Sequence, residues 1–270
     1  MRRHLLDTRN SAAHDLAPPR MPPRTYVIAS TPRSGSTLLC RLLWASGRAG
    51  APKEYLNPMQ LRDWEVRFGE RRRDRAFARA LRGPLVGIGM ARRGWDPARI
   101  AAHLERVRAR RSSGGWFGLK LHHHHRIRWF AEAGLPTMLG DVTWIRIQRE
   151  DRLRQAVSWS RAEQTGQWAS WQRPLLPPVY SRRRIEARRK DLDEAERSWD
   201  AHLQGEDVLD VRYEALAAAP QQTMRRVLHW LGVPDAAAVT VPEPDLHRQA
   251  DAITEQWLAR FIRADPAQWG

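Results

Sequence analysis

The chain has 270 residues and a hydrophobic content of 42%, which is enough for one domain with a substantial core. Its formal net charge is +16, and all but three of its 46 basic residues are arginines, so we expect an anionic partner: nucleic acid, a membrane surface, or a phosphorylated or sulfated small molecule. A single cysteine, Cys40, excludes an intrachain disulfide framework and favours a reducing, cytoplasmic location, and no apolar run is long enough to span a membrane.

Residues 1–24 are polar and rich in proline, and they contain neither the apolar segment nor the cleavage site of a signal peptide. We expect them to form a disordered extension. One α/β domain is expected to follow over residues 25–270. Met21, just before the first predicted strand, is an alternative start of translation.

The stretch from Thr25 to Cys40 predicts a strand, a polar loop and a helix. Tyr26 to Ala29 is rich in strand formers, a polar segment with Pro and Gly follows, and leucines then recur at helical spacing. Such a turn directs backbone N–H groups and a helix N-terminus at one point, which attracts a phosphate-like anion. Arg33 adds a positive charge, and Ser36 and Thr37 are candidate helix caps. The loop lacks the Lys and the first Gly of a Walker loop, and an ordinary capped strand–turn–helix is the alternative.

The loop at residues 47–58 follows this helix and can fold back over the same crevice. It carries Glu54, an acidic residue in a basic neighbourhood. A surface ion pair with Lys53 or an arginine is an equal alternative to a functional role for Glu54. Residues 61–111 are charge-rich and predict helices, interrupted near residues 83–94, that form an insertion beside the sheet.

A second strand is predicted at residues 115–121, with Lys120 near its end, and four consecutive histidines, His122 to His125, follow it. Histidine is a common metal ligand. Consecutive side chains point in different directions, however, and no Cys or carboxylate lies nearby at ligand spacing. We therefore expect the histidines to line a cleft, and no metal is expected.

A third strand is predicted at residues 141–148, whose nearly continuous strand formers are typical of a buried parallel strand. A helix is predicted from Arg149 onward. Arg149 then lies at the C-terminal end of the strand, where ligands bind in open α/β sheets. Ser158 follows nine residues later, so the two side chains could share one phosphate; a capping or surface arginine is the alternative.

The loop at residues 164–178 contains Trp168 and Trp171, which either stack on flat partners such as sugar rings or dock the loop onto the core. Further elements are predicted as helices at 181–203, 221–231 and 253–262 and as a strand at 208–213. Strands alternating with helices predict an α/β fold: a P-loop-like three-layer sandwich with a central, mostly parallel sheet.

Taken together, the ordered motifs resemble the bacterial carbohydrate sulfotransferases typified by trehalose 2-sulfotransferase, which use 3′-phosphoadenosine 5′-phosphosulfate (PAPS). The resemblance covers about residues 25–263. The motifs that carry it are Arg33-Ser-Gly-Ser-Thr-Leu-Leu39, Pro52-Lys-Glu-Tyr55, Phe117-Gly-Leu-Lys120, Arg149 with Asp151 and Gln155-Ala-Val-Ser158, Gln164-Thr-Gly-Gln-Trp168, Arg212-Tyr-Glu214 and Arg248-Gln-Ala-Asp251.

The resemblance implies that PAPS is the donor and 3′,5′-ADP (PAP) a product. It implies donor binding by the loop residues and two later groups: Arg33, Ser34, Gly35, Ser36 and Thr37 for the 5′-phosphosulfate, Arg149 and Ser158 for the 3′-phosphate, and Arg248 and Gln249 near the nucleotide. Glu54 matches the family's catalytic base, and Arg33 is the second expected catalytic residue.

On the acceptor side we expect Lys53, Tyr55, Lys120, His123 and Trp168 to contact a carbohydrate or glycolipid. Two features depart from the family: Ala51 stands where trehalose 2-sulfotransferase has Glu, and the histidine run replaces a Met-Trp-Asn-Gln-like stretch. The donor chemistry therefore carries over better than trehalose as the acceptor. The family also implies a possible homodimer.

The expected reaction is in-line sulfuryl transfer to an acceptor hydroxyl, in which positioning and charge stabilisation dominate. Two alternatives remain open from the sequence. A P-loop kinase or NTPase is disfavoured by the missing Walker Lys. A nucleic-acid-binding protein fits the net charge, but the arginines are spread along the chain and no recognised binding motif is present.

Overall fold

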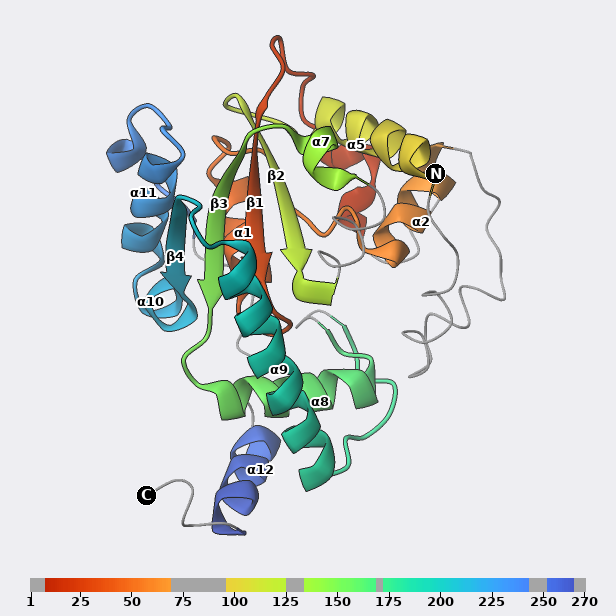
Figure 1. The fold of residues 1–270 in the computed structure, drawn as a ribbon, viewed down its shortest axis with the longest axis vertical. Coiled ribbons are helices and arrows are strands. Elements are labelled where there is room, and N and C mark those ends of the chain that lie inside the picture. Colours follow the sequence, from red (N-terminus) through yellow and green to blue (C-terminus); the bar gives the residue numbers. More distant parts are fainter. Residues whose placement is uncertain (1–7, 69–95, 125–133, 169–171, 243–251, 265–270) are drawn as a thin grey trace.

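A computed structural model describes residues 8–68, 96–124, 134–168, 172–242 and 252–264. Its centre is a four-stranded sheet of order β2-β1-β3-β4, in which every neighbouring pair is parallel (Figure 1). The strands are β1 (Arg24–Ser30), β2 (Trp116–His122), β3 (Val142–Gln148) and β4 (Val208–Arg212). Ser30 is in register with His122 on one side and Ile147 on the other, so the first three strands end together.

Alternate residues of β1 enter two different cores, as the period of a strand requires. Tyr26 and Ile28 pack with α1 (Ser36–Ala45) and α11 (Pro220–Trp230) on one face. Val27 and Ala29 pack with α5 (Pro97–Arg111) and α9 (Arg182–His202) on the other. Helices on both faces of a parallel sheet confirm the predicted three-layer α/β fold.

A third apolar cluster joins α8 (Arg152–Thr165), α9 and α12 (Ala252–Arg263) beyond the C-terminal ends of the strands (Figure 1). The helix expected from Arg149 starts at Arg152, because the Asp151 carboxylate caps it by accepting from Arg154 N. The remaining elements are α2 (Pro58–Phe68), α7 (Leu135–Leu139), α10 (Tyr213–Ala218) and short 3₁₀ turns at Thr8–Asn10, Ala12–His14 and Ala236–Ala238.

Residues 8–16 differ from the expectation of a disordered extension. Asn10 is fully buried, and its side-chain amide donates to Asp63 at 2.6 Å and to Gln60 at 2.7 Å. Asp15 accepts from Arg67 at 2.9 Å and lies 3.3 Å from the fully buried Arg111. Polar partners on α2 and α5, rather than apolar burial, order this segment, and composition alone does not reveal such partners.

No helix within the described residues is both long enough and apolar enough to cross a membrane.

Candidate active site

The loop between β1 and α1 leaves the first turn of the helix uncapped by side chains. Gly35 is the N-cap, with φ 88°, and no side chain provides a cap there. The expectation that Ser36 or Thr37 caps the helix was therefore wrong, because Ser36 and Thr37 are already the first two residues of the helix. Leu38 N and Leu39 N both donate to the Gly35 carbonyl, so the N–H groups of Ser36 and Thr37 are the ones that a ligand at the loop could use.

Only glycine fits at position 35. A Cβ added there would lie 2.3 Å from Cδ2 of Tyr213, and the positive φ disfavours any other residue. The same tyrosine ring lies 4.8 Å below the guanidinium of Arg149. Tyr213 therefore packs the loop and the end of β3 against each other.

Ser34 provides a polar group that is ready for a ligand. Its side chain is fully buried, and among the described residues its Oγ has no hydrogen-bond partner. Leaving such a group unsatisfied costs about 1–3 kcal/mol. An anion oxygen held by this loop would satisfy it, so the loop fits a bound phosphate or sulfate group.

The basic residues predicted from separate motifs come together beside this loop. Arg33 Nε donates to Ser158 Oγ at 2.9 Å, Arg33 Nη1 donates to the Trp168 carbonyl, and Arg149 Nη1 approaches the Arg33 carbonyl at 3.5 Å. Burial and the neighbouring Arg149 lower the pKa of Arg33 to about 10, and burial lowers that of Arg149. An anion bound between these two partly desolvated guanidinium groups would be stabilised by charge-assisted hydrogen bonds from both.

The buried carboxylate of Glu196 on α9 is hydrogen-bonded to the loop between β1 and α1. Glu196 accepts from Arg146 and Arg152, at 2.8 and 2.9 Å, from Gln148 at 2.9 Å, and from Thr31 at 3.2 Å. Gln155 on α8 donates to Thr31 Oγ1 at 2.9 Å and to the Pro32 carbonyl at 2.8 Å. These bonds fix the loop relative to the end of β3 and to the helix that carries Ser158.

Glu54 reaches the site because its loop runs beside β2. Lys53 forms a parallel bridge with Leu119, and Lys120 N donates to Lys53 O at 2.9 Å. Glu54 Oε1 then lies 2.5 Å from Lys120 Nζ, and its Oε2 accepts from Asn57 at 2.9 Å. Lys120 also donates to Thr37 Oγ1 at 3.2 Å, which links the carboxylate to the anion loop.

The other residues expected on the acceptor side have varied positions. Tyr55 is fully buried, stacks on Phe117 and donates to the Ala51 carbonyl, so it belongs to the core. Lys53 Nζ donates to Asn10 Oδ1 at 2.5 Å. The Trp168 side chain is 46% exposed beside the Arg33 contact, and His123 is half-buried at the end of β2. Arg248 and Gln249 lie outside the described residues.

Sequence reasoning expected the histidine run to line a cleft but chose His123 as the site residue, whereas Nε2 of His122 lies 3.3 Å from Glu54 Oε1. A usable signal was present: His122 is two residues after Lys120, so both side chains share one face of β2. It also missed Glu196, since nothing in the sequence of a long, charged helix distinguishes one buried glutamate from its exposed neighbours.

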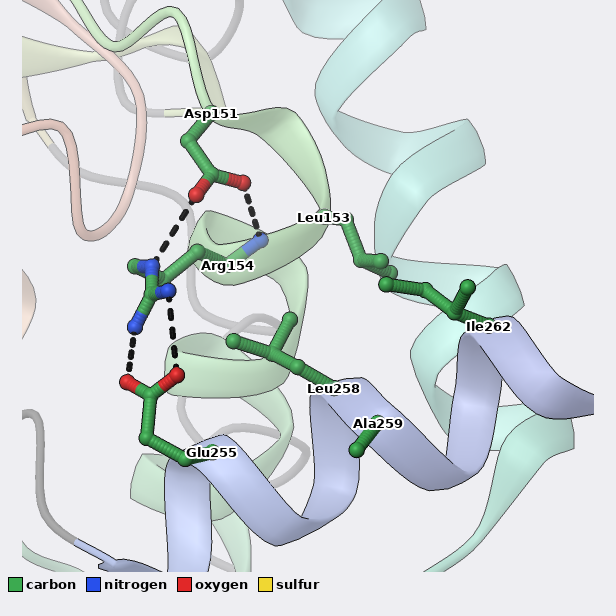
Figure 2. Close-up of a pocket in the computed structure, with 7 residues that line it drawn as sticks. All are labelled: Asp151, Leu153, Arg154, Glu255, Leu258, Ala259 and Ile262. Carbon is green, nitrogen blue, oxygen red and sulfur yellow. Dashed lines mark hydrogen bonds and ion pairs between the residues drawn. The ribbon is translucent and has the colours of Figure 1, made fainter. Parts of the chain in front are cut away.

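A separate pocket of about 420 Å³ lies between α8 and α12 (Figure 2). Leu153, Leu258, Ala259 and Ile262 form its apolar part. Its cation, Arg154, is held between Asp151 and Glu255, as the dashed lines show. The charge of Arg154 in this pocket is thus already compensated by two carboxylates.

Comparison with known proteins identifies the family of this fold and site. The sequence profile of Stf0 sulphotransferases matches residues 25–265. The chain belongs to the Stf0 sulphotransferase family. Trehalose 2-sulfotransferase of Mycobacterium tuberculosis is 29% identical over 273 residues, covering 92% of this chain and 97% of the relative. The enzyme of the same name from Mycolicibacterium smegmatis is 29% identical over 265 residues, covering 89% and 95%.

Two solved structures with some similarity to this sulphotransferase carry the name sulfotransferase. One from Mycobacterium avium covers 91% of this chain and 69% of its own, with 14% identity and a TM-score of 0.45. The sulfotransferase domain of the curacin biosynthetic pathway covers 90% and 98%, with 16% identity and a TM-score of 0.42. As a member of the family, the chain is an enzyme.

Proposed function

We propose that this sulphotransferase transfers the sulfuryl group of PAPS to a hydroxyl of a carbohydrate-containing acceptor, with Glu54 as the general base. The observation that carries the proposal is the meeting of Arg33, Arg149 and Ser158 beside an uncapped helix N-terminus, with Glu54 linked to the same loop through Lys120. This arrangement supports the proposal because it could supply two adjacent anion sites and one carboxylate, which a phosphosulfate donor with a second phosphate requires.

In this proposal Ser34, Gly35, Ser36 and Thr37 hold the 5′-phosphosulfate by their N–H groups and hydroxyls, and Arg33 compensates the charge that develops on the bridging oxygen. Arg149 and Ser158 hold the 3′-phosphate. The partial desolvation of both arginines supports these roles, because charge-assisted bonds to phosphate oxygens strengthen in such surroundings. Arg248 and Gln249 complete the nucleotide site as the family resemblance implies.

In the proposed reaction the protein contributes mainly by positioning the reactants and stabilising charge, with little covalent chemistry of its own. An acceptor hydroxyl attacks sulfur in line while the bond from sulfur to the 5′-phosphate breaks, and Glu54 receives the hydroxyl proton. A positioned general base contributes roughly 10²–10⁴-fold to the rate. Asn57 and Lys120 orient the carboxylate for this role.

The acceptor part of the proposal rests on the relatives, which are named for trehalose, and on Trp168, whose exposed ring can stack on a sugar. Lys120 and His123 lie at the adjoining end of β2. We leave Lys53 and Tyr55 out of the proposed acceptor site, because Lys53 donates to Asn10 and Tyr55 is buried in the core. We place the enzyme in the cytoplasm, consistent with its single buried cysteine.

Calorimetry distinguishes this function from the two alternatives. The full chain is titrated in parallel with 3′,5′-ADP, with ATP–Mg²⁺ and with a random DNA duplex at physiological salt. The proposal predicts the tightest binding for 3′,5′-ADP. Tighter binding of ATP–Mg²⁺ would favour a kinase or NTPase, and tighter, salt-dependent binding of the duplex would favour a nucleic-acid-binding protein.

A further inference from the structure

His122 lies against Glu54, and the proposed reaction does not yet use it. It ends β2, is buried, and places Nε2 3.3 Å from Glu54 Oε1. Its other ring nitrogen, Nδ1, is 3.0 Å from Ser30 Oγ at the end of β1. The imidazole thus bridges the proposed base and the end of the neighbouring strand.

The contacts of the Ser30 hydroxyl favour one of the two neutral tautomers of the His122 ring. The Ser30 hydroxyl donates to the Leu121 carbonyl at 3.1 Å, so it presents lone pairs to His122 Nδ1. With the hydroxyl hydrogen on the Leu121 carbonyl, Nδ1 is the donor of the contact with Ser30, and in the neutral ring Nε2 then has the lone pair. That lone pair faces a carboxylate oxygen, and the contact becomes a hydrogen bond only when one more proton lies between Nε2 and Oε1.

The charged groups around the pair come from three elements. Lys120 of β2 lies 2.5 Å from Glu54 Oε1, and the His124 ring lies 5.8 Å from that of His122. Lys53 precedes Glu54 in its own loop, and the Cys40 thiol of α1 is electrostatically coupled to Glu54, Lys120 and Lys53. Burial raises the pKa of Cys40 to about 12, so this thiol stays neutral and does not compete for the proton.

We propose that His122 holds, together with Glu54, the proton that the acceptor hydroxyl loses during sulfuryl transfer. The proposal rests on the function proposed above. The acceptor oxygen forms its bond to sulfur, the bond between sulfur and the 5′-phosphate oxygen breaks with its electron pair staying on 3′,5′-ADP, and the hydroxyl proton passes to Glu54 and is held between Oε1 and Nε2. Because His122 acts through Glu54, it is a positioning residue rather than a group that contacts the reacting atoms.

The protonation state of the ring is tested without donor or acceptor. We expect ¹⁵N spectra of the histidine-labelled full chain near neutral pH to show His122 as the Nδ1–H tautomer, with its signals assigned by their loss in His122→Gln. An Nε2–H tautomer or a doubly protonated ring would overturn the proposal, because either one already fills the position of the acceptor's proton.

Kinetics test whether the two residues act as one unit. Release of 3′,5′-ADP from PAPS is measured with trehalose as acceptor, and with water alone, for Glu54→Gln, His122→Gln and the double variant. We expect His122→Gln to lower kcat about tenfold or more while KM for PAPS changes less than about twofold, and the double variant to fall no further than Glu54→Gln. Multiplying effects would overturn the proposal. His229→Gln, exposed on α11, is the control.

A wild-type chain that does not turn over PAPS would contradict the proposed function, and the tautomer measurement would still decide the role of His122.

Discussion

The guanidinium of Arg33 donates to the hydroxyl of Ser158 at 2.9 Å, joining two residues that lie 125 positions apart in the sequence. The first belongs to the loop after β1 and the second to α8. Their contact brings the residues that separate motifs predicted to bind anions together at one edge of the sheet, beside Arg149. A donor with a 5′-phosphosulfate and a 3′-phosphate could span them.

Arg149→Ala is expected to weaken binding of 3′,5′-ADP by about 10- to 100-fold, because a charge-assisted hydrogen bond contributes about 1.5–3 kcal/mol. Calorimetric titration of the purified variant measures this. Arg154→Ala is the control: its guanidinium is held by Asp151 and Glu255 in the pocket of Figure 2 and is not expected to contact the nucleotide. Equal losses in both variants, or no loss in Arg149→Ala, would contradict the 3′-phosphate assignment.

Gly35→Ala is expected to destabilise the protein and abolish donor binding, because the new Cβ would meet the Tyr213 ring at 2.3 Å. The expected loss is about 2–4 kcal/mol, from strain at positive φ plus overpacking. Gly47→Ala is a matched control: Gly47 also has positive φ, 67°, but nothing lies within 4 Å of its added Cβ, so it should lose only about 1 kcal/mol. Urea unfolding of both variants gives the difference, and equal losses would mean that Tyr213 does not constrain the loop.

Glu196→Gln is expected to cost about 3 kcal/mol, because the buried Arg146 keeps only the exposed carboxylate of Asp200 and Arg152 loses its ion pair with Glu196. Asp200→Asn removes the exposed second partner of Arg146 and should cost less than about 1 kcal/mol. Urea unfolding at neutral pH compares them. Similar losses in the two variants would contradict a supporting role specific to Glu196.

The same carboxylate predicts a pH dependence. Burial opposes its ionised form, but hydrogen bonds from Arg152, Gln148 and Arg146 outweigh burial and lower the pKa of Glu196 below the ordinary 4.5. Its contribution is therefore present above about pH 4.5 and is lost as the pH falls through the lower folded pKa. Thermal unfolding should show wild type losing stability over that range more steeply than Glu196→Gln, and parallel curves would contradict this.

Asn10→Ala should destabilise the protein by about 1–3 kcal/mol, since the buried Asp63 carboxylate would lose the hydrogen bond donated by Asn10. Ala13→Ser, exposed in the same segment, should be nearly neutral. Differential scanning calorimetry compares the two. A neutral Asn10→Ala would show that residues 8–16 do not stabilise the fold in solution.

The layers of the fold could be predicted from the sequence because each strand has a strong local pattern. Val142–Gln148 is nearly continuous in strand formers, and Ser36–Ala45 keeps leucines on one side, so both elements were predicted within a few residues. The roles of Arg149 and Ser158 were suggested by the position of Arg149 at a strand end, which is a property of topology rather than of detailed packing.

Contacts between distant segments could not be predicted in this way. Glu54 meets His122 because a single bridge pairs Lys53 with Leu119, and a loop sequence does not specify that register. The burial of Asn10 likewise depends on Asp63 and Gln60, each of which reads as a surface residue in isolation. Tyr55 was assigned to the acceptor by its motif, whereas its ring fills the core against Phe117.

Transfer of ³⁵S from labelled PAPS to carbohydrate is the most direct measurement of the central claim, with trehalose as the first acceptor and fractionated cell extract as the second. Wild type, Glu54→Gln and the control Glu105→Gln, an exposed glutamate on α5, are compared. We predict labelled product from wild type and Glu105→Gln, and at least about a 100-fold slower rate from Glu54→Gln. Unchanged transfer by Glu54→Gln, or no transfer by wild type to any acceptor, would contradict the account.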